Sequence, residues 1–336
     1  MTDSEPHRPI VGVVGCGVTG SRVVAHLAAE GVRVAVYDDA HSVASAAARR
    51  VKGIVLDRLD ELTACDVVVL CQPGPHADLA GLLIDERTTV VSVGGDLDDT
   101  RALLDLHDRA VLAHVPLVVG AGMAPGLSGL LARYLSGQLH TVDELHVAIH
   151  GTAGPACARQ HHVALGQAAL GWHDGEWIEP PGGSGRDLVW FPEPVHAHDC
   201  YRAALVDPLL LHRSFPSALR ITARVSATRR DRLTARLPML APPHATGDLG
   251  AVRVEVRGAG PDGARLTVIA GSAAPTADLT AAVAAATTTQ ITCLGLEPGA
   301  HSLADSSMAA LDLLHHATRL GAKVQEYTGV GRATGW

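Results

Sequence analysis

The sequence predicts an α/β protein, with an N-terminal doubly wound parallel sheet and an inserted α+β domain that has a largely antiparallel sheet. Two observations lead to this prediction. In the first 120 residues, short continuous apolar runs alternate with segments of helical periodicity, as in sheets that helices cover on both faces. Later, residues 219–225, 252–256 and 265–270 alternate apolar and polar side chains, as strands with one face toward solvent do.

The elements of the first half follow from these patterns. The apolar runs expected to form the parallel sheet cover residues 10–14, 32–37, 53–56, 66–71, 88–93 and 110–115. The helices expected between them cover residues 20–31, 41–50, 76–84 and 98–109, and residues 59–63 are expected to form a short helix or a turn. Asp98 or Asp99 is the expected cap of the last of these helices. Ligands of such sheets lie beyond the carboxyl ends of the strands.

A glycine motif stands between the first two apolar runs. Gly15, Gly17 and Gly20 have the spacing G-x-G-x-x-G, and Asp38 ends the second run. Gly15 allows a sharp turn off the strand, Gly17 leaves room for a pyrophosphate, and Gly20 allows close packing of helix and strand. The pyrophosphate would lie at the positive helix end, with Asp38 on the adenosine ribose. The first domain is therefore predicted to be a Rossmann domain that binds an adenine dinucleotide.

The acidic residues after the second run favour NAD over NADP. A carboxylate about 4 Å from the 2′-phosphate of NADP would repel each unit of charge by roughly 1 kcal/mol in water and about 4 kcal/mol at a partly buried site. Asp39 adds a second negative charge to Asp38. The nearest upstream arginine, Arg33, is expected at the opposite end of the strand.

The residues predicted to contact the cofactor all follow the carboxyl ends of expected parallel strands. They are Gly15, Cys16, Gly17, Val18, Thr19, Gly20, Asp38, Asp39, Cys71, Gln72, Pro73, His76 and Gly94.

The rest of the chain divides less regularly. Further strands are expected over residues 143–149 and 189–191, and helices over residues 161–170, 277–288 and 303–320, with a turn-rich stretch at 171–185. The predicted domains are a Rossmann domain (1–125), an α+β domain for substrate binding or dimerisation (126–296) and a C-terminal segment (297–336) that returns to the Rossmann domain.

Composition restricts the partners and the chemistry. The net charge is −8 with no basic block, which argues against a nucleic-acid partner. Lys52 and Lys323 are the two lysines, so a catalytic lysine has few possible positions. The six cysteines show no C-x-x-C pair, and residues 1–9 lack the apolar core of a signal peptide, so a cytoplasmic location is expected.

Residues 110–132 contain no Asp, Glu, Lys or Arg. This length could cross a bilayer, but His114, Pro116 and several glycines interrupt it. A buried strand, a glycine-rich turn and a buried helix explain the segment better. That helix would have Pro125 in its first turn and run to residue 135, with its N-terminus beside the nicotinamide.

Three groups of residues give the chain a family resemblance. The segment GAGMAPGLSGLLA at 120–132 resembles the saccharopine dehydrogenase-like NAD(P)-dependent oxidoreductases. So do the segments at 174–177 (DGEW) and 189–194 (VWFPEP). The third group is the strand at 266–271, the helix at 277–286 and the sequence LEP at 296–298.

This resemblance implies a Rossmann domain, an inserted α+β domain and a cleft between them. It also implies NAD(P)-linked chemistry at a carbon that bears nitrogen, which is the reversible reduction of an imine, and thus a small-molecule substrate of amino-acid metabolism. A homodimer is the default assembly for such a fold.

Imine reduction requires a proton donor and, for an acidic substrate, a cation. The catalytic candidates are His114, which ends the sixth expected strand, and His150 and Arg159. His161 and His162 lie close behind Arg159. The candidate substrate-binding residues are Met123, Pro125, Gly126, His162 and Arg186, whose planar guanidinium matches a carboxylate.

Two other functions stay open at this point. In a strand, the sequence HAHDC would place His196, His198 and Cys200 on one face, where they could bind zinc, although no partner cluster is evident and no metal is expected. The chain could also be a non-catalytic NAD-binding regulatory or partner subunit, because the second half shows no compact catalytic motif.

Overall fold

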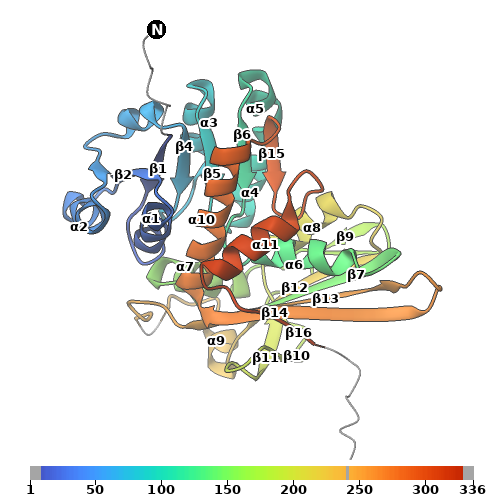
Figure 1. Cartoon of the computed structure of the whole chain (residues 1–336). Helices are drawn as coiled ribbons and strands as arrows, with labels where there is room; N and C mark the ends of the chain where they lie inside the picture. The colour runs from blue at the N-terminus through green and yellow to red at the C-terminus, as the bar shows by residue number, and fades with distance from the viewer. Residues whose placement is uncertain (1–8, 240–241, 328–336) are drawn as a thin grey trace, which may run out of the picture.

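The computed structural model describes residues 9–239 and 242–327. Two sheets form two layers, with the parallel sheet and its helices at the top of Figure 1 and the second sheet below them. The N-terminal residues 1–8, on which the prediction of no signal peptide rests, lie outside the described residues.

The first sheet has seven parallel strands in the order β15-β6-β5-β4-β1-β2-β3. Its strands are β1 (Ile10–Val14), β2 (Arg33–Tyr37), β3 (Ile54–Val55), β4 (Val67–Leu70), β5 (Thr89–Ser92), β6 (Pro116–Val119) and β15 (Gly299–Ser302). From β1 the chain proceeds outward to β2 and β3, and then outward on the other side from β4 to β6. The order therefore reverses between β1 and β4, where ligands of doubly wound sheets bind.

Helices cover both faces of this sheet, which confirms the predicted fold class. They are α1 (Gly20–Ala29), α2 (His41–Val51), the 3₁₀ helix η1 (Leu59–Ala64), α3 (Ala77–Asp85), α4 (Leu97–Asp105) and α5 (His107–Ala113). Alternate residues of β1 enter different cores: Val11 and Val13 pack in the cluster with α1 and α2, whereas Val14 packs in the cluster with α3. This alternation explains why the strands read as continuous apolar runs.

The sixth strand was predicted wrongly. Residues 110–115 belong to the end of α5 and the connection after it, and the strand begins at Pro116. A short apolar run is compatible with either a buried strand or a buried helix. Pairing with β5 and β15 selects the segment from Pro116, in which Leu117 and Val118 are fully buried.

The helix predicted over residues 98–109 is in fact two helices, α4 and α5. Its cap is also not the predicted one. Asp96 caps α4, because its side chain accepts hydrogen bonds from the N–H groups of Asp98 and Asp99.

The second sheet has nine strands and is mostly antiparallel, as predicted, with one parallel pair between β7 and β12. Its strands are β7 (Thr141–His150), β8 (Gly171–His173), β9 (Glu176–Ile178), β10 (Asp187–Trp190), β11 (Ala197–Arg202), β12 (Arg220–Ser226), β13 (Leu249–Ala259), β14 (Arg265–Pro275) and β16 (Val324–Glu326). The other helices are α6 (Leu127–Ser136), α7 (Pro155–Gly166), α8 (Asp207–Ser214), α9 (Arg229–Thr234), α10 (Thr276–Leu294) and α11 (Ala310–Arg319).

Several elements differ from the predicted ranges. α7 begins six residues before the expected helix at 161–170, because Pro155 suits a helix start. α6 begins at Leu127, after Gly126, and not at Pro125. α11 begins at Ala310 and not at 303, and the periodicity did not predict α8, α9, β15 or β16.

The last part of the chain joins the two layers. β15 pairs with β6 in the parallel sheet, whereas β16 pairs with β14 in the second sheet. Helix α10 is buried over most of its length and contacts α1, α11 and β14. The predicted domain boundaries at 125 and 296 stay predictions.

In the part of the chain that the structure describes, no helix has both the length and the apolar character needed to cross a membrane. The uncharged stretch 110–132 contributes instead to α5, β6 and α6.

Candidate active site

The glycine-rich turn connects β1 to α1 with the geometry expected of its glycines. Gly15 has φ +84°, a conformation that favours glycine, and an added Cβ would lie 2.5 Å from the backbone nitrogen of Gln72. At Gly20 an added Cβ would lie 1.8 Å from the carbonyl oxygen of Gly15. Both positions therefore require glycine for close backbone approach.

Gly17 has open space around it. It is exposed, and an added Cβ would meet no heavy atom within 4 Å. Within the described residues, the N–H groups of Val18 and Thr19, just before α1, have no hydrogen-bond acceptor. Unpaired N–H groups at a helix start attract anions, so this turn fits the pyrophosphate of a dinucleotide.

Asp38 lies beside this turn. Its Oδ2 accepts a hydrogen bond from the N–H of Cys16 at 2.7 Å, and its Oδ1 accepts one from the N–H of Ala40 at 2.9 Å. These bonds fix the carboxylate at the end of β2, next to the glycines. Asp39 is exposed, and Arg33 is the first residue of β2 and thus at the opposite end of the strand, as predicted.

The ends of β4 and β5 complete this edge of the sheet. Gln72 and Cys71 follow β4 and contact the turn at Gly15 and Gly20. His76 is buried; its Nδ1 is 2.8 Å from Ser92 Oγ and its Nε2 is 2.8 Å from the carbonyl oxygen of Gln72. Burial lowers the pKa of His76, so it is neutral and ties the end of β4 to that of β5.

Asp99 supports the same region from α4. Its carboxylate accepts hydrogen bonds from the N–H groups of His76 and Ala77, and so caps α3. The predicted cofactor residues thus gather at the carboxyl ends of β1, β2, β4 and β5, while contact of each with a cofactor stays a prediction.

The segment after β6 folds back on itself beside these ends. An added Cβ at Gly126, which has φ +135°, would lie 2.1 Å from the carbonyl oxygen of Gly122. The N–H of Met123 donates to Thr280 Oγ1 at 3.3 Å, and an added Cβ at Gly95 would lie 3.0 Å from Pro125 Cδ. Pro125 therefore lies beside the end of β5, whereas Met123 bonds to α10 and Gly126 packs against Gly122.

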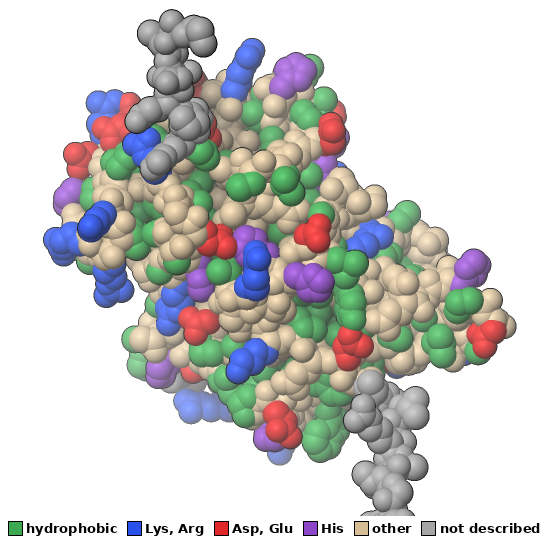
Figure 2. All heavy atoms as spheres, viewed as in Figure 1, with side chains coloured by type: hydrophobic (Ala, Val, Ile, Leu, Met, Phe, Trp, Pro, Cys, Tyr) green, Lys and Arg blue, Asp and Glu red, His purple; other side chains and the backbone are tan. Residues whose placement is uncertain are grey.

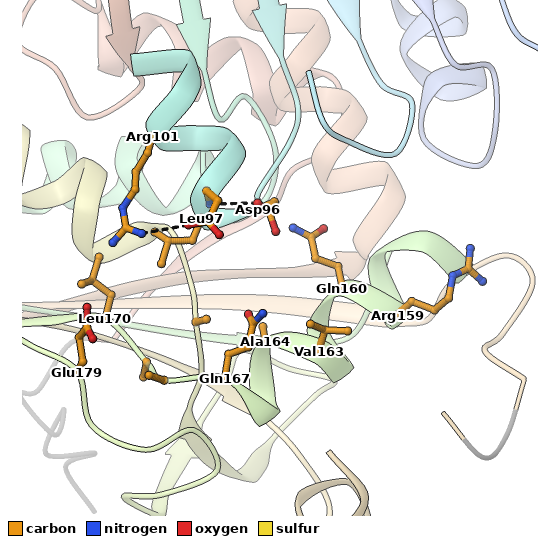
Figure 3. A pocket seen from close by; sticks show the side chains of 14 residues that line it. Asp96, Leu97, Arg101, Arg159, Gln160, Val163, Ala164, Gln167, Leu170 and Glu179 are labelled. Atoms are coloured by element: carbon orange, nitrogen blue, oxygen red, sulfur yellow. Dashed lines mark hydrogen bonds and ion pairs between the residues drawn. The ribbon is translucent and has the colours of Figure 1, made fainter. Parts of the chain in front are cut away.

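A pocket of about 410 Å³ opens between α4, α7 and the residues that flank the β8–β9 hairpin, Leu170 and Glu179 (Figure 3). Its volume is in the range of small-molecule sites. Arg159 and Gln160 of α7 and Asp96, the cap of α4, line it. In Figure 3, Gln160 points toward Asp96, whereas the guanidinium of Arg159 points away from the other labelled side chains. None of its lining residues belongs to the glycine-rich turn, but Asp96 follows Gly94 and Gly95 directly.

His150 ends β7 in a small polar and aromatic cluster. Its Nδ1 is 2.8 Å from Ser226 Oγ, and its ring centroid is 4.1 Å from that of His198. Burial, and then the neighbouring His198, lower the pKa of His150 to about 4. His150 is thus neutral at pH 7, which suits a proton acceptor better than a proton donor.

The structure does not place the other predicted residues together. His114 is exposed and lies after α5, at the amino end of β6, so the reason for choosing it was wrong. Arg186 is 68% exposed and pairs with Asp199 at 3.0 Å. His162 Nε2 lies 2.8 Å from the carbonyl oxygen of Leu237, which turns it toward the segment after α9.

The residues of the HAHDC sequence also lie in separate environments. β11 begins at Ala197, so His196 is outside the strand, and His198 Nε2 lies 3.1 Å from the carbonyl oxygen of Val195. Burial raises the pKa of Cys200 to about 12, which keeps its thiol protonated. Among residues 9–239 and 242–327, no three His, Cys, Asp or Glu side chains are grouped to hold a metal ion.

One group of neighbouring side chains near the site, Cys157, His161 and Asp207, was not predicted from the sequence. Cys157 and His161 lie one turn apart on α7, with Sγ 3.8 Å from Nε2, and Asp207 at the start of α8 acts on the charge of His161. The spacing C-x₃-H just after Pro155 was a readable signal for the first two. Asp207 could not be paired with them before the fold was known.

The chain is similar to known proteins in the sequence of its N-terminal part and in the fold of most of its length. The NAD-binding domain of the D-isomer specific 2-hydroxyacid dehydrogenase family matches residues 1–87. The structure of apo saccharopine dehydrogenase (L-Glu forming) from Saccharomyces cerevisiae superposes with a TM-score of 0.72 at 16% identity, covering 95% of this chain and 100% of that chain. The chain has the fold of saccharopine dehydrogenase.

A second structure, a mutant of meso-dapdh from Clostridium tetani E88 with DAP, has a TM-score of 0.50 at 14% identity and covers 92% of this chain and 95% of that chain. No curated protein sequence matches the chain. The saccharopine dehydrogenase resemblance predicted from residues 120–132 is thus confirmed for the fold, and the N-terminal domain is of the NAD-binding dehydrogenase type.

Proposed function

We propose that the protein is an NAD-dependent oxidoreductase that transfers a hydride to or from the imine or amine carbon of an amino-acid-like small molecule. The main support is the glycine-rich turn, with open space at Gly17 and unpaired N–H groups before α1, at the switch point of a saccharopine dehydrogenase fold. The bound nicotinamide would supply or accept the hydride. The chain's own residues would bind, orient and protonate the substrate.

The pocket beside Gly94 and Gly95 is the proposed substrate site. Its lining includes Gln160, and Arg159 lies at its rim, where its exposed guanidinium points away from the other lining side chains in Figure 3. Pro125 lies next to Gly95, just before the pocket residue Asp96. A guanidinium such as that of Arg159 suits a substrate carboxylate. The pocket has the volume of a small-molecule site and is adjacent to the strand end that faces the reactive part of a dinucleotide in this type of sheet.

The experiment is NADH oxidation by the full chain with pyruvate, 2-oxoglutarate or butyraldehyde, each combined with ammonia, L-lysine or L-glutamate. NADH binding is measured separately by calorimetry. Binding with turnover of at least one pair supports the proposal. Binding without any turnover would favour a regulatory or partner subunit. The absence of binding would contradict both functions, because both require the glycine-rich turn to bind a dinucleotide.

The proposed cofactor is NAD, because Asp38 and Asp39 repel a 2′-phosphate. We expect Asp38→Asn to bring the NADPH and NADH affinities closer by about fivefold or more, which corresponds to roughly 1 kcal/mol. The amide oxygen of Asn can accept one of the two hydrogen bonds that Asp38 accepts, from Cys16 or from Ala40, so the readout is the ratio of the two cofactor affinities within the variant. Titration of both cofactors checks this, with Asp57→Asn, an exposed carboxylate outside the proposed site, as the matched control.

We also infer that the protein is a cytoplasmic homodimer without a nucleic-acid or membrane partner. The free thiols of all six cysteines support the cytoplasmic location. Side chains of both charge signs are interspersed on the face in Figure 2, which argues against a nucleic-acid partner. The dimer is the default assembly for such a fold. Sedimentation equilibrium should give twice the mass of the chain, and a concentration-independent monomer would contradict the dimer. Cell fractionation tests the location.

A further inference from the structure

Cys157 and His161 form a side-chain pair on the face of α7. They are four positions apart in the sequence, so they lie on the same side of the helix, with Cys157 Sγ 3.8 Å from His161 Nε2. Both are half-buried, which leaves them within reach of a small molecule. Cys157 is the third residue of α7, where N–H groups and the helix dipole favour a thiolate.

The charges around the pair favour the ionised forms of both groups. Burial alone would raise the pKa of Cys157, but the charge and hydrogen bond of His161 and the backbone of Ala153 bring that pKa below its ordinary value. Burial would lower the pKa of His161, but Cys157 and then Asp207 raise it above its ordinary value. In the described chain, the charged groups that act on the pair are each other and Asp207.

Asp207 connects the pair to the helix after β6. It is buried at the start of α8, and burial raises its pKa to about 6. The nearby Ser128 hydroxyl of α6, the backbone at Asp207 and the charge of His161 partly offset this effect, although Ser128 Oγ is beyond hydrogen-bond distance of any partner in the described residues. At pH 7 Asp207 is therefore mostly ionised and stabilises the imidazolium of His161. Ser128 lies in the first turn of α6, beside the carboxyl end of β6.

The N-terminal half of α7 lies over the predicted cofactor site. An added Cβ at Gly154 would lie 3.2 Å from Val18 Cγ2 in the glycine-rich turn. An added Cβ at Gly95 would lie 4.0 Å from Gln160 Nε2. Cys157 lies on the helix between Gly154, which is next to the glycine-rich turn, and Gln160, which lines the pocket. The pair does not line the pocket itself, so it lies between the turn and the pocket.

We propose that Cys157 and His161 are a thiolate–imidazolium acid–base pair that delivers the proton to the substrate nitrogen. This proposal rests on the proposed function. In the reductive direction the imine carbon gains a hydride from the nicotinamide, and the nitrogen gains the proton that Nε2 shares with Sγ. The products are an amine and NAD⁺, and the pair, left as thiolate and neutral imidazole, regains a proton from water.

The first test measures the pair itself and needs no substrate. The full chain is alkylated with iodoacetamide from pH 5 to 9, and mass spectrometry gives the rate at Cys157 and at Cys293, an exposed cysteine without a histidine partner in the described residues. As the pH is lowered, the rate at Cys157 should stay level over a range in which the rate at Cys293 falls. In His161→Asn the curve of Cys157 should move to higher pH, beyond that of Cys293, because burial then raises the pKa of Cys157 without the opposing charge of His161. Coincident curves in the wild type would overturn the pair.

The second test places the pair in the site. Saturating NAD⁺ should slow alkylation of Cys157 and leave Cys293 unchanged. If calorimetry shows that NAD⁺ is bound but Cys157 is not protected, the pair lies outside the reaction site and the proposal fails. If NAD⁺ does not bind at all, the proposed function fails, while the pH curves still decide whether the pair exists.

The third test measures turnover with the best substrate pair of the panel. Cys157→Ser and His161→Asn should lower kcat about a hundredfold, with the NADH Kd unchanged. The alkaline decline of the wild-type kcat, where the pair loses its proton, should disappear in His161→Asn. Cys293→Ser and His315→Asn, both at exposed positions, should keep the wild-type kcat. Wild-type kcat in the Cys157 and His161 variants would refute proton delivery by the pair.

Discussion

At the scale of residues, the glycines of the first turn have separate physical roles that the structure distinguishes. Gly20 is needed because a Cβ would collide with the carbonyl oxygen of Gly15, while Gly17 has empty space on the side where a Cβ would project. The first role concerns folding, and the second concerns what the turn binds. A pair of alanine substitutions therefore separates stability from binding.

We expect Gly20→Ala to lower the free energy of unfolding by about 2–4 kcal/mol, because the backbone must shift to admit the methyl group. Gly17→Ala should change it by less than about 0.5 kcal/mol but weaken NADH binding, because the methyl group occupies the pyrophosphate position. Urea unfolding and calorimetric titration with NADH measure the two effects. Equal loss of stability in both variants would contradict this assignment.

A second prediction concerns His150 and the dependence of the free energy of unfolding on pH. Its pKa is about 4 in the folded protein, against an ordinary value near 6.5, because burial and His198 disfavour its charged form. The unfolded chain therefore binds more protons between these values, and stability falls as pH is lowered. The contribution of His150 is fully present above about pH 6.5 and is lost as the pH falls toward 4.

After allowance for partial solvent exposure, this loss is about 1–2 kcal/mol. Urea unfolding at pH 7.0, 5.5 and 4.5 measures it as the difference between the wild type and His150→Gln, which cannot titrate but can still bond Ser226. The variant should lose less stability on acidification. Parallel curves for the two proteins would show that His150 does not contribute.

At the scale of elements, α10 is a weakly amphipathic helix that is buried in the core. Its alanine-rich middle is buried on every side, between α1, α11 and the second sheet. Small side chains allow close approach of several elements at once, and a helix that is apolar all round belongs in a core. The alanines were therefore a signal of burial as much as of helix propensity.

We expect Ala284→Leu in α10 to lower the free energy of unfolding by about 1–3 kcal/mol, because Ala284 is fully buried and the core has no space for three more carbons. The matched control is Ala25→Leu on the exposed face of α1, where the same change should be nearly neutral. Thermal unfolding compares the two. A neutral Ala284→Leu would mean that α10 packs loosely.

At the scale of the whole molecule, the two sheets meet where the proposed chemistry occurs. The first sheet supplies the glycine-rich turn and Asp38, and the second part of the chain supplies α7 with Cys157, His161 and Arg159. Gly154 touches the turn at Val18, so contact between the layers carries the catalytic candidates to the cofactor edge. Neither layer alone would form the proposed site.

We therefore expect a bound cofactor to stabilise the whole chain. NADH at a hundred times its Kd should add about 2.7 kcal/mol to the free energy of unfolding, because the ligand binds only the folded state. Gly17→Ala should abolish most of this gain without loss of stability in the ligand-free protein. Differential scanning calorimetry with and without NADH checks the expectation, and an unchanged Tm for the wild type would contradict it.

The sequence alone determined the turn, the identity of most strands and the fold class. These features are local, because the glycine spacing, the acid at the end of β2 and the continuous apolar runs act within about thirty residues. The resemblance of residues 120–132, 174–177, 189–194 and 266–298 to the saccharopine dehydrogenase-like oxidoreductases implied the same fold.

Tertiary structure decided the rest. The run at 110–115 is compatible with a helix or a strand, and only pairing with β5 and β15 selected Pro116–Val119 as the strand, which removed the reason for choosing His114. Asp207 acts on His161 across 46 positions of sequence, and the spacing of the chain does not encode such proximity. Long-range packing fixes which polar side chains face one another, because the energy of burying them depends on partners that lie far away along the chain.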